Sequence, residues 1–141
     1  MRKPEWLEEM EHTADVGISV RAGSLPKLFE RAGWGLFFLI TDIEQVRPAR
    51  EESVTVQGTD REDLMARWLS ELVFRHETRH WLFCRFKVDK IDENSVAARV
   101  AGEPIDQKRH AIHRAVKAVT YHGLAVAREG DGFRANVILD V

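Results

Sequence analysis

The chain has 141 residues, of which 44% are hydrophobic and 31% are charged, and its formal net charge at pH 7 is -2. This length fits one domain, expected over residues 1–141, and the charge argues against a protein whose main task is to hold nucleic acid phosphates. The single cysteine excludes an intramolecular disulfide and a Cys-rich zinc site. We expect a cytoplasmic protein, because no stretch approaches the ~18 apolar residues of a membrane span and no secretory signal is recognisable.

The first predicted elements are two strands and a helix. Residues 6–12 are weakly extended, and residues 16–21 alternate between apolar and polar side chains, as a half-buried strand does. Ser24 is a suitable N-cap and Pro26 is tolerated in a first turn, so a helix is expected over about residues 25–40. Because this helix is apolar nearly all round, we expect it to be buried on two sides; the alternative is that it covers a partner.

A second strand and helix follow. The apolar residues of 54–58 predict a short strand. Thr59 and Glu62 have the spacing of a capping box, in which each side chain satisfies the backbone donor of the other. The apolar residues of 64–73 then recur at helical spacing, which predicts an amphipathic helix.

The rest of the chain has the patterns of strands. Residues 82–88 and 96–100 alternate around a polar turn, which predicts a hairpin. Residues 113–127 are mostly extended, and residues 133–140 alternate after the glycine-containing turn 129–132. The element order predicts an α+β domain with two main helices packed on a mixed, largely antiparallel sheet.

Carboxylates lie near both ends of the sequence. Asp15 is close to the N-terminus, and Asp140 directly precedes Val141, the last residue. If the end segments are neighbouring strands, these two side chains and the Val141 carboxylate converge. Such oxygen ligands suit a hard cation such as Ca²⁺, Mg²⁺ or Mn²⁺. The alternative is that Asp15 only shapes a turn and Asp140 is a solvated end residue.

A short histidine motif suggests a different chemistry. Residues 76–80 read His-Glu-Thr-Arg-His and match the zinc-protease pattern, in which two histidines share one helix face. The motif lies at the end of its predicted helix rather than within it. A zinc hydrolase is therefore only a minor alternative, and histidines that favour the helix C-terminal dipole are the expected account.

Positive charge is concentrated in residues 107–117. Lys108 and Arg109 are candidates for contact with a nucleotide phosphate, an RNA backbone or acidic residues of a partner. The alternative is a solvated loop whose charges balance acids elsewhere. Lys117 either contacts the acidic ends or a partner, or extends from a strand edge into solvent. His12 is expected to line the same end of the sheet.

Seven segments, in this order along the chain, resemble the archease family. They are Glu-His-Thr-Ala-Asp-Val-Gly at 11–17, Phe-Glu-Arg-Ala at 29–32, Asp-Arg-Glu-Asp-Leu at 60–64, Trp-Leu-Ser-Glu-Leu at 68–72, Gly-Glu at 102–103, Lys-Ala-Val-Thr-Tyr-His at 117–122 and Val-Ile-Leu-Asp-Val at 137–141. The first, sixth and last segments together are quite specific.

The resemblance implies a protein cofactor, not an enzyme, of an RtcB-type RNA ligase in tRNA splicing. Such a cofactor promotes guanylylation of the ligase histidine and multiple turnover. The resemblance also favours the metal site at Asp15, Asp140 and Val141, with Ca²⁺ expected and Mg²⁺ or Mn²⁺ as alternatives. An RNA-binding or chaperone-like module acting through residues 107–117 is the competing function, and direct RNA contact is left open.

Overall fold

The computed structural model describes residues 3–11 and 15–141. In chain order the elements are β1 (Leu7–Glu11), β2 (Asp15–Ala22), α1 (Leu25–Ile40), the 3-10 helix η1 (Ile43–Gln45), β3 (Arg50–Gln57), α2 (Arg61–Arg79), β4 (Trp81–Ile91), β5 (Ser95–Pro104), β6 (Ala118–Glu129) and β7 (Gly132–Asp140). No helix in this part of the chain is both long and apolar enough to cross a membrane.

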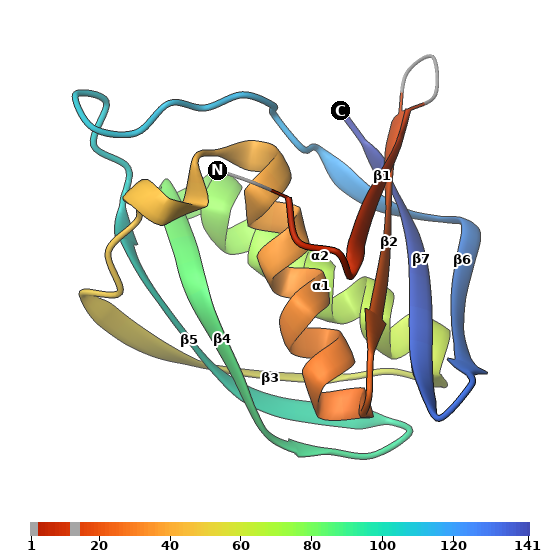
Figure 1. Ribbon diagram of the computed structural model, residues 1–141. Helices are drawn as coiled ribbons and strands as arrows, with labels where there is room; N and C mark the ends of the chain where they lie inside the picture. Colours follow the sequence, from red (N-terminus) through yellow and green to blue (C-terminus); the bar gives the residue numbers. More distant parts are fainter. Residues whose placement is uncertain (1–2, 12–14) are drawn as a thin grey trace.

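The strands of the described residues form two antiparallel sheets with the helices between them (Figure 1). Sheet A has the strand order β1-β2-β7-β6, and sheet B has the order β3-β5-β4. All strand pairs are antiparallel. The predicted α+β class, with two main helices packed on a largely antiparallel sheet, is confirmed, but the sheet is not mixed, because none of these strand pairs is parallel. Instead of one sheet there are two, and together they cover apolar surface on both sides of the helices.

Helix α1 packs closely against both sheets, and Ser24 caps its first turn as predicted. A Cβ atom added at Gly33 would lie 2.8 Å from Cδ1 of Phe86 in sheet B. A Cβ atom added at Gly35 would lie 3.1 Å from Cδ1 of Leu7 in sheet A. The two glycines therefore allow a sheet to approach each side of the helix, and the predicted burial on two sides is confirmed.

The predicted capping box of α2 is wrong by one residue. Asp60 is the N-cap and accepts the N–H of Asp63 at 2.8 Å, while the Asp63 carboxylate accepts the N–H of Thr59 at 2.9 Å. Glu62 instead accepts the N–H of Val126 at 3.0 Å, which ties the start of the helix to β6. The acidic side chains thus satisfy backbone donors both within the helix end and across to sheet A.

The predicted hairpin is confirmed as β4–β5, and the predicted turn at 129–132 joins β6 to β7 in a second hairpin. Extended strand structure was predicted from residue 113, but β6 begins only at Ala118. Residues 105–117 instead form a long connection between the sheets, called the connecting loop below. Its backbone donates to a carbonyl at the C-terminus of α1 instead of pairing with a strand, since His113 N–H donates to Ile40 O at 2.7 Å.

Candidate functional site

The carboxylates predicted to converge are adjacent in space. Strand β2 runs antiparallel to β7, and Asp15 lies directly opposite Asp140 in their register. Opposite residues project from the same face of a sheet, with Cβ atoms about 4.5–5.5 Å apart. Val141 follows Asp140 at the end of β7, where Figure 1 places the C-terminus. Asp15 is therefore a strand residue rather than part of a turn.

Asp15 and Asp140 place two negative charges opposite each other. Within residues 3–11 and 15–141, neither Asp15 nor Asp140 has an ion-pair partner or a side-chain hydrogen bond. Like charges directly opposite each other destabilise a sheet. Carboxylate oxygens are also the ligands that Ca²⁺ and Mg²⁺ prefer. The arrangement therefore has the donor atoms that a hard cation needs.

The side chains do not form a closed metal centre by themselves. In the described part of the chain, no group of three or more His, Cys, Asp or Glu side chains is placed to hold a metal ion. Asp15 and Asp140 offer two side-chain ligands, and Val141 adds only main-chain oxygens. A cation with six to eight oxygen ligands would need further ligands from water or from a partner.

A third carboxylate lies at this end of the molecule and was missed from sequence. The Asp42 carboxylate follows α1, and its Oδ1 lies 2.9 Å from Nε2 of His113. Four residues further along, the N–H of Lys117 donates to Asp140 O at 2.8 Å. Four residues span at most about 14 Å, so the Cα atoms of His113 and Lys117 lie within that distance of each other. Only the loop path, which periodicity does not reveal, brings Asp42 here.

The predicted contact residues lie in different settings. Lys117 is exposed, and its ammonium has no partner among the residues that the structure describes. The suggested ion pair between Lys117 and the carboxylate pair is therefore not formed. Lys108 is also exposed, and its N–H donates to Oδ1 of Asp106 at 3.0 Å. His12 lies outside the described residues.

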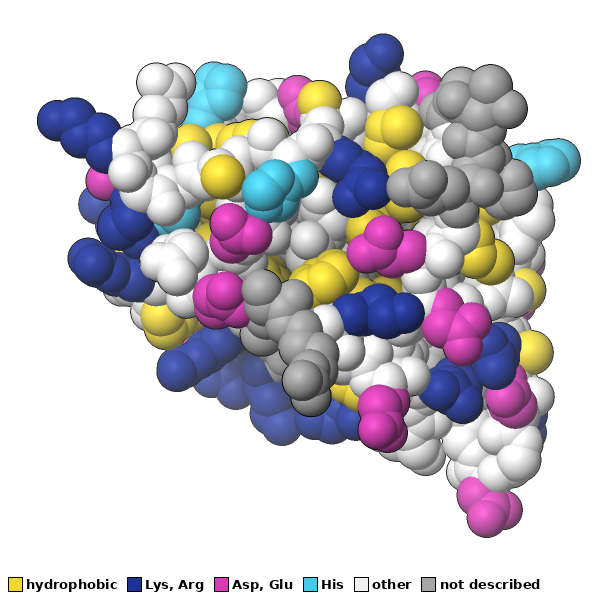
Figure 2. Space-filling view, turned by 45° about the horizontal axis from the view of Figure 1, so that its top comes forward, with side chains coloured by type: hydrophobic (Ala, Val, Ile, Leu, Met, Phe, Trp, Pro, Cys, Tyr) yellow, Lys and Arg dark blue, Asp and Glu magenta, His cyan; other side chains and the backbone are white. Residues whose placement is uncertain are grey.

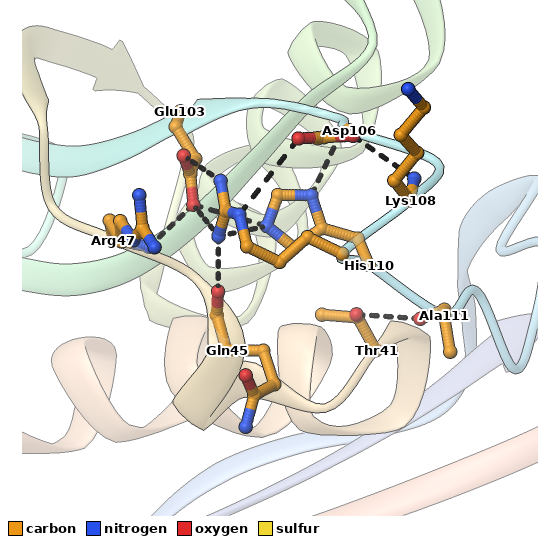
Figure 3. A network of polar contacts seen from close by, with 9 residues as sticks. Thr41, Gln45, Arg47, Glu103, Asp106, Lys108, His110 and Ala111 are labelled. Atoms are coloured by element: carbon orange, nitrogen blue, oxygen red, sulfur yellow. Dashed lines mark hydrogen bonds and ion pairs between the residues drawn. The ribbon is translucent and has the colours of Figure 1, made fainter.

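Arg109 is partly buried and is hydrogen-bonded to other residues of the protein. Its Nη2 and Nη1 lie 2.6 and 2.9 Å from the two carboxylate oxygens of Glu103, and Nη1 also donates to Gln45 O at 2.8 Å (Figure 3). Only 25% of the Arg109 side chain is exposed. The guanidinium joins the connecting loop to β5 and η1. Contact of Arg109 with a partner would compete with these bonds.

His110 completes the same network and has a defined tautomer. Its Nδ1 accepts the N–H of Asp106 at 2.8 Å, so in the neutral ring the proton is on Nε2. Nε2 then donates to Oε2 of Glu103 at 3.1 Å. The imidazole is fully buried. His110 and His113 thus have separate carboxylate partners, Glu103 and Asp42.

Glu103 carries the negative charge of this network. Hydrogen bonds from Arg109 lower the pKa of the Glu103 carboxyl to about 2, helped by the Arg47 N–H and by His110 and opposed by burial. Arg47 N–H donates to Oε2 at 2.7 Å. Buried carboxylates are retained in proteins when they are paired and hydrogen-bonded in this way. Glu103 lies in the Gly-Glu segment at 102–103, and the sequence pattern does not indicate that it binds Arg109 and His110.

The histidine motif at 76–80 has structural roles. Nδ1 of His76 lies 2.8 Å from Trp81 O, and the buried ring packs edge-on against Phe37 with centroids 5.9 Å apart. His80 is the left-handed C-cap of α2, with φ of 55°. The motif is therefore at the helix end, as expected. Its first histidine is committed to packing and a backbone bond, which disfavours a zinc hydrolase.

Figure 2 brings the top of Figure 1 forward and shows acidic, basic and histidine side chains interspersed with apolar ones on this face. Binding to a phosphate backbone generally uses a continuous positive surface. A mixed surface is better suited to a protein partner that carries both charges.

The chain resembles known proteins over nearly all of its length. The model of the archease protein family matches residues 7–141. Protein archease of Methanopyrus kandleri is 39% identical over 137 residues, which cover 95% of this chain and 98% of that protein. Protein archease of Sulfurisphaera tokodaii is 32% identical over 137 residues, with 96% and 98% covered.

Two solved structures have the same fold. The solution structure of Methanobacterium thermoautotrophicum protein 1598 superposes with a TM-score of 0.80 at 33% identity, covering 96% of this chain and 99% of that one. The crystal structure of an archease from Thermotoga maritima, described as a possible chaperone, gives a TM-score of 0.65 at 22% identity, covering 100% and 98%. The second likeness concerns the fold alone.

Proposed function

This chain belongs to the archease protein family, and from that premise we propose that it is a protein cofactor, not an enzyme, of an RtcB-type tRNA-splicing RNA ligase in the cytoplasm. In this function it promotes guanylylation of the ligase histidine and multiple turnover. The observation that supports a site for this activity is the opposed pair Asp15 and Asp140.

The carboxylate pair would hold a divalent cation, with Ca²⁺ expected and Mg²⁺ or Mn²⁺ as alternatives. Asp15 and Asp140 would bind through side-chain oxygens, and Val141 through its carboxylate or backbone oxygen. A cation bound here supplies positive charge that can polarise phosphate oxygens of a nucleotide. Because the pair lies at the end of sheet A, the same residues are accessible to a partner.

Lys117 is the best-placed cationic contact. Its backbone N–H is fixed to Asp140 O, while its ammonium is exposed and has no partner among the described residues. The side chain is therefore free to bind a phosphate of the nucleotide or a carboxylate of the ligase. Lys108 and His12 remain further contact candidates, and Arg109 is a weaker one because Glu103 already holds it.

The test is guanylylation of a cognate RtcB-type ligase with GTP and Mn²⁺ under multiple turnover, with and without this protein. Asp15→Asn and Asp140→Asn should abolish most of the stimulation while circular dichroism shows an intact fold. Asp131→Asn, in the β6–β7 turn at the other end of sheet A, is the matched control and should stimulate normally. Full stimulation by both site variants would remove the carboxylate pair from the function.

RNA binding by the isolated protein is the second candidate, supported by the exposed Lys108 in the connecting loop. It predicts affinity for single-stranded RNA that falls steeply with salt and is lost in Lys108→Gln. Because the charges on the face shown in Figure 2 are mixed, we rank RNA binding below the ligase function. Ligase stimulation that survives Lys108→Gln would separate the two.

A further inference from the structure

The connecting loop is the only described segment that leads from sheet B directly to the carboxylate pair. It leaves β5 beside Glu103, crosses the end of the helices and reaches Asp140 (Figure 1). Lys117 is its last residue. The position of this lysine therefore depends on how the loop is held along its length.

The first attachment is the network around Glu103 (Figure 3). The carboxylate accepts from both terminal nitrogens of Arg109, from Nε2 of His110 and from the Arg47 N–H, at 2.6 to 3.1 Å. Its side chain is only 10% exposed. One buried carboxylate thus fixes two successive residues of the loop by charge-assisted hydrogen bonds.

The second attachment is at the end of α1. Thr41 Oγ1 donates to Ala111 O at 2.7 Å, and His113 N–H donates to Ile40 O at 2.7 Å. Ala111 directly follows His110 in the sequence. By fixing His110, the Glu103 network therefore also positions Ala111 for its hydrogen bond with Thr41.

The third attachment is the backbone carbonyl of Asp140. Only residues 114–116 separate His113 from Lys117, and Val116 within them is fully buried. The Lys117 N–H then donates to Asp140 O at 2.8 Å. Both ends of this short stretch are hydrogen-bonded and Val116 in it is buried, so the position of Lys117 is closely constrained by the position of His113.

We propose that Glu103 is a positioning residue, which fixes the connecting loop through Arg109 and His110 and so sets where Lys117 presents its ammonium beside Asp140. The inference rests on the proposed function for the role of Lys117, but the coupling between Glu103 and the loop does not. Arg109 accordingly acts within the protein rather than on a ligand.

The test variant is Glu103→Gln, which keeps the shape of the side chain and removes its charge. Asp89→Asn is the matched control, because Asp89 also binds an arginine through two bonds, at 2.9 and 2.8 Å to Arg99, away from the loop. If Glu103→Gln does not fold, Arg109→Lys replaces it, since lysine keeps the charge but cannot bond both oxygens in the same way.

Amide hydrogen exchange measures the coupling without any ligase. In Glu103→Gln, the His113 and Lys117 amides should exchange at least roughly tenfold faster, as expected when charged hydrogen bonds are lost. Amides in the centre of β2 and β7 should be unchanged, and Asp89→Asn should alter none of them. Unchanged exchange at His113 and Lys117 would overturn the proposal.

Ligase stimulation then tests whether the positioning matters. Glu103→Gln should lower stimulation at least fivefold in the wild-type background but have little further effect in a Lys117→Gln background, because both changes remove the same contact. Independent, multiplying losses would overturn the role of Glu103 in placing Lys117, as would a stimulation that Glu103→Gln leaves intact. If the unmodified protein itself fails to stimulate, the proposed function fails while hydrogen exchange still decides the coupling.

Discussion

Neutralising one member of the carboxylate pair should stabilise the protein when no divalent cation is present. Asp15 and Asp140 are directly opposite each other in antiparallel strands, without compensating partners among the described residues. At a separation of about 5 Å in a water-like dielectric, two unit charges repel by about 0.8 kcal/mol. Asp15→Asn removes this repulsion and keeps the size of the side chain. For a chain of this size the gain raises Tm by about 2–3 °C.

The assay is thermal unfolding in a chelator, followed by titration with CaCl₂. Asp131→Asn, in the β6–β7 turn, should leave Tm unchanged. At high salt the Tm difference between Asp15→Asn and the wild type should shrink, because the Debye length falls to about 3 Å at 1 M. With Ca²⁺ at about a hundred times its Kd, the wild type should gain about 2.7 kcal/mol and become the more stable protein.

Two outcomes would refute this reasoning. A lower Tm for Asp15→Asn in chelator would mean that the Asp15 carboxylate makes a favourable contact, not a repulsive one. Equal stabilisation of wild type and Asp15→Asn by Ca²⁺ would mean that the cation binds elsewhere. Repeating the titration with Mg²⁺ and Mn²⁺ ranks the three candidate cations.

Three further predictions concern packing and pH. Trp68→Phe should destabilise the protein by about 1–3 kcal/mol in urea unfolding, because the indole Nε1–H donates to buried Phe29 O at 2.9 Å. Gly33→Ala should also lower the free energy of unfolding in urea, by about 1–3 kcal/mol, since the added Cβ would lie 2.8 Å from the Phe86 ring. The pKa of Glu103 is lowered from 4.5 to about 2, so its stabilising effect is complete above about pH 4.5 and is lost as pH falls toward about 2. The difference in unfolding free energy between wild type and Glu103→Gln should therefore narrow between about pH 4.5 and about pH 2, and a constant difference would contradict the shift.

Local sequence patterns predicted the elements well where one signal dominated. Ser24 followed by an apolar helix, and alternating residues on either side of a polar turn, each have one simple structural solution. These features depend on periodicity and turn chemistry, which are properties of residues close together in the sequence. The pairing of Asp15 with Asp140 is not local, and it followed only from the condition that the end segments are neighbouring strands, which the register of β2 and β7 meets.

Other features that depend on distant partners were missed. Periodicity shows which residues are apolar but not which strands adjoin, so one sheet was predicted where two enclose the helices. The network of Glu103 and Arg109 joins a strand end to a loop and leaves no periodic signal. The capping error at Thr59 has a similar origin, since Glu62 was the expected partner but is bonded to β6 instead.

The place of β7 within sheet A has a consequence for how the protein is made. This last strand lies between β2 and β6, and it pairs with residues of β2 that are more than 100 positions earlier in the chain. Contacts between such distant segments form slowly, because a long stretch of chain must first be brought together. During synthesis β2 has no strand partner other than β1 until residues 132–140 leave the ribosome. The carboxylate pair is thus completed only once β7 has been made, and fragments that lack β7 cannot hold a cation between Asp15 and Asp140.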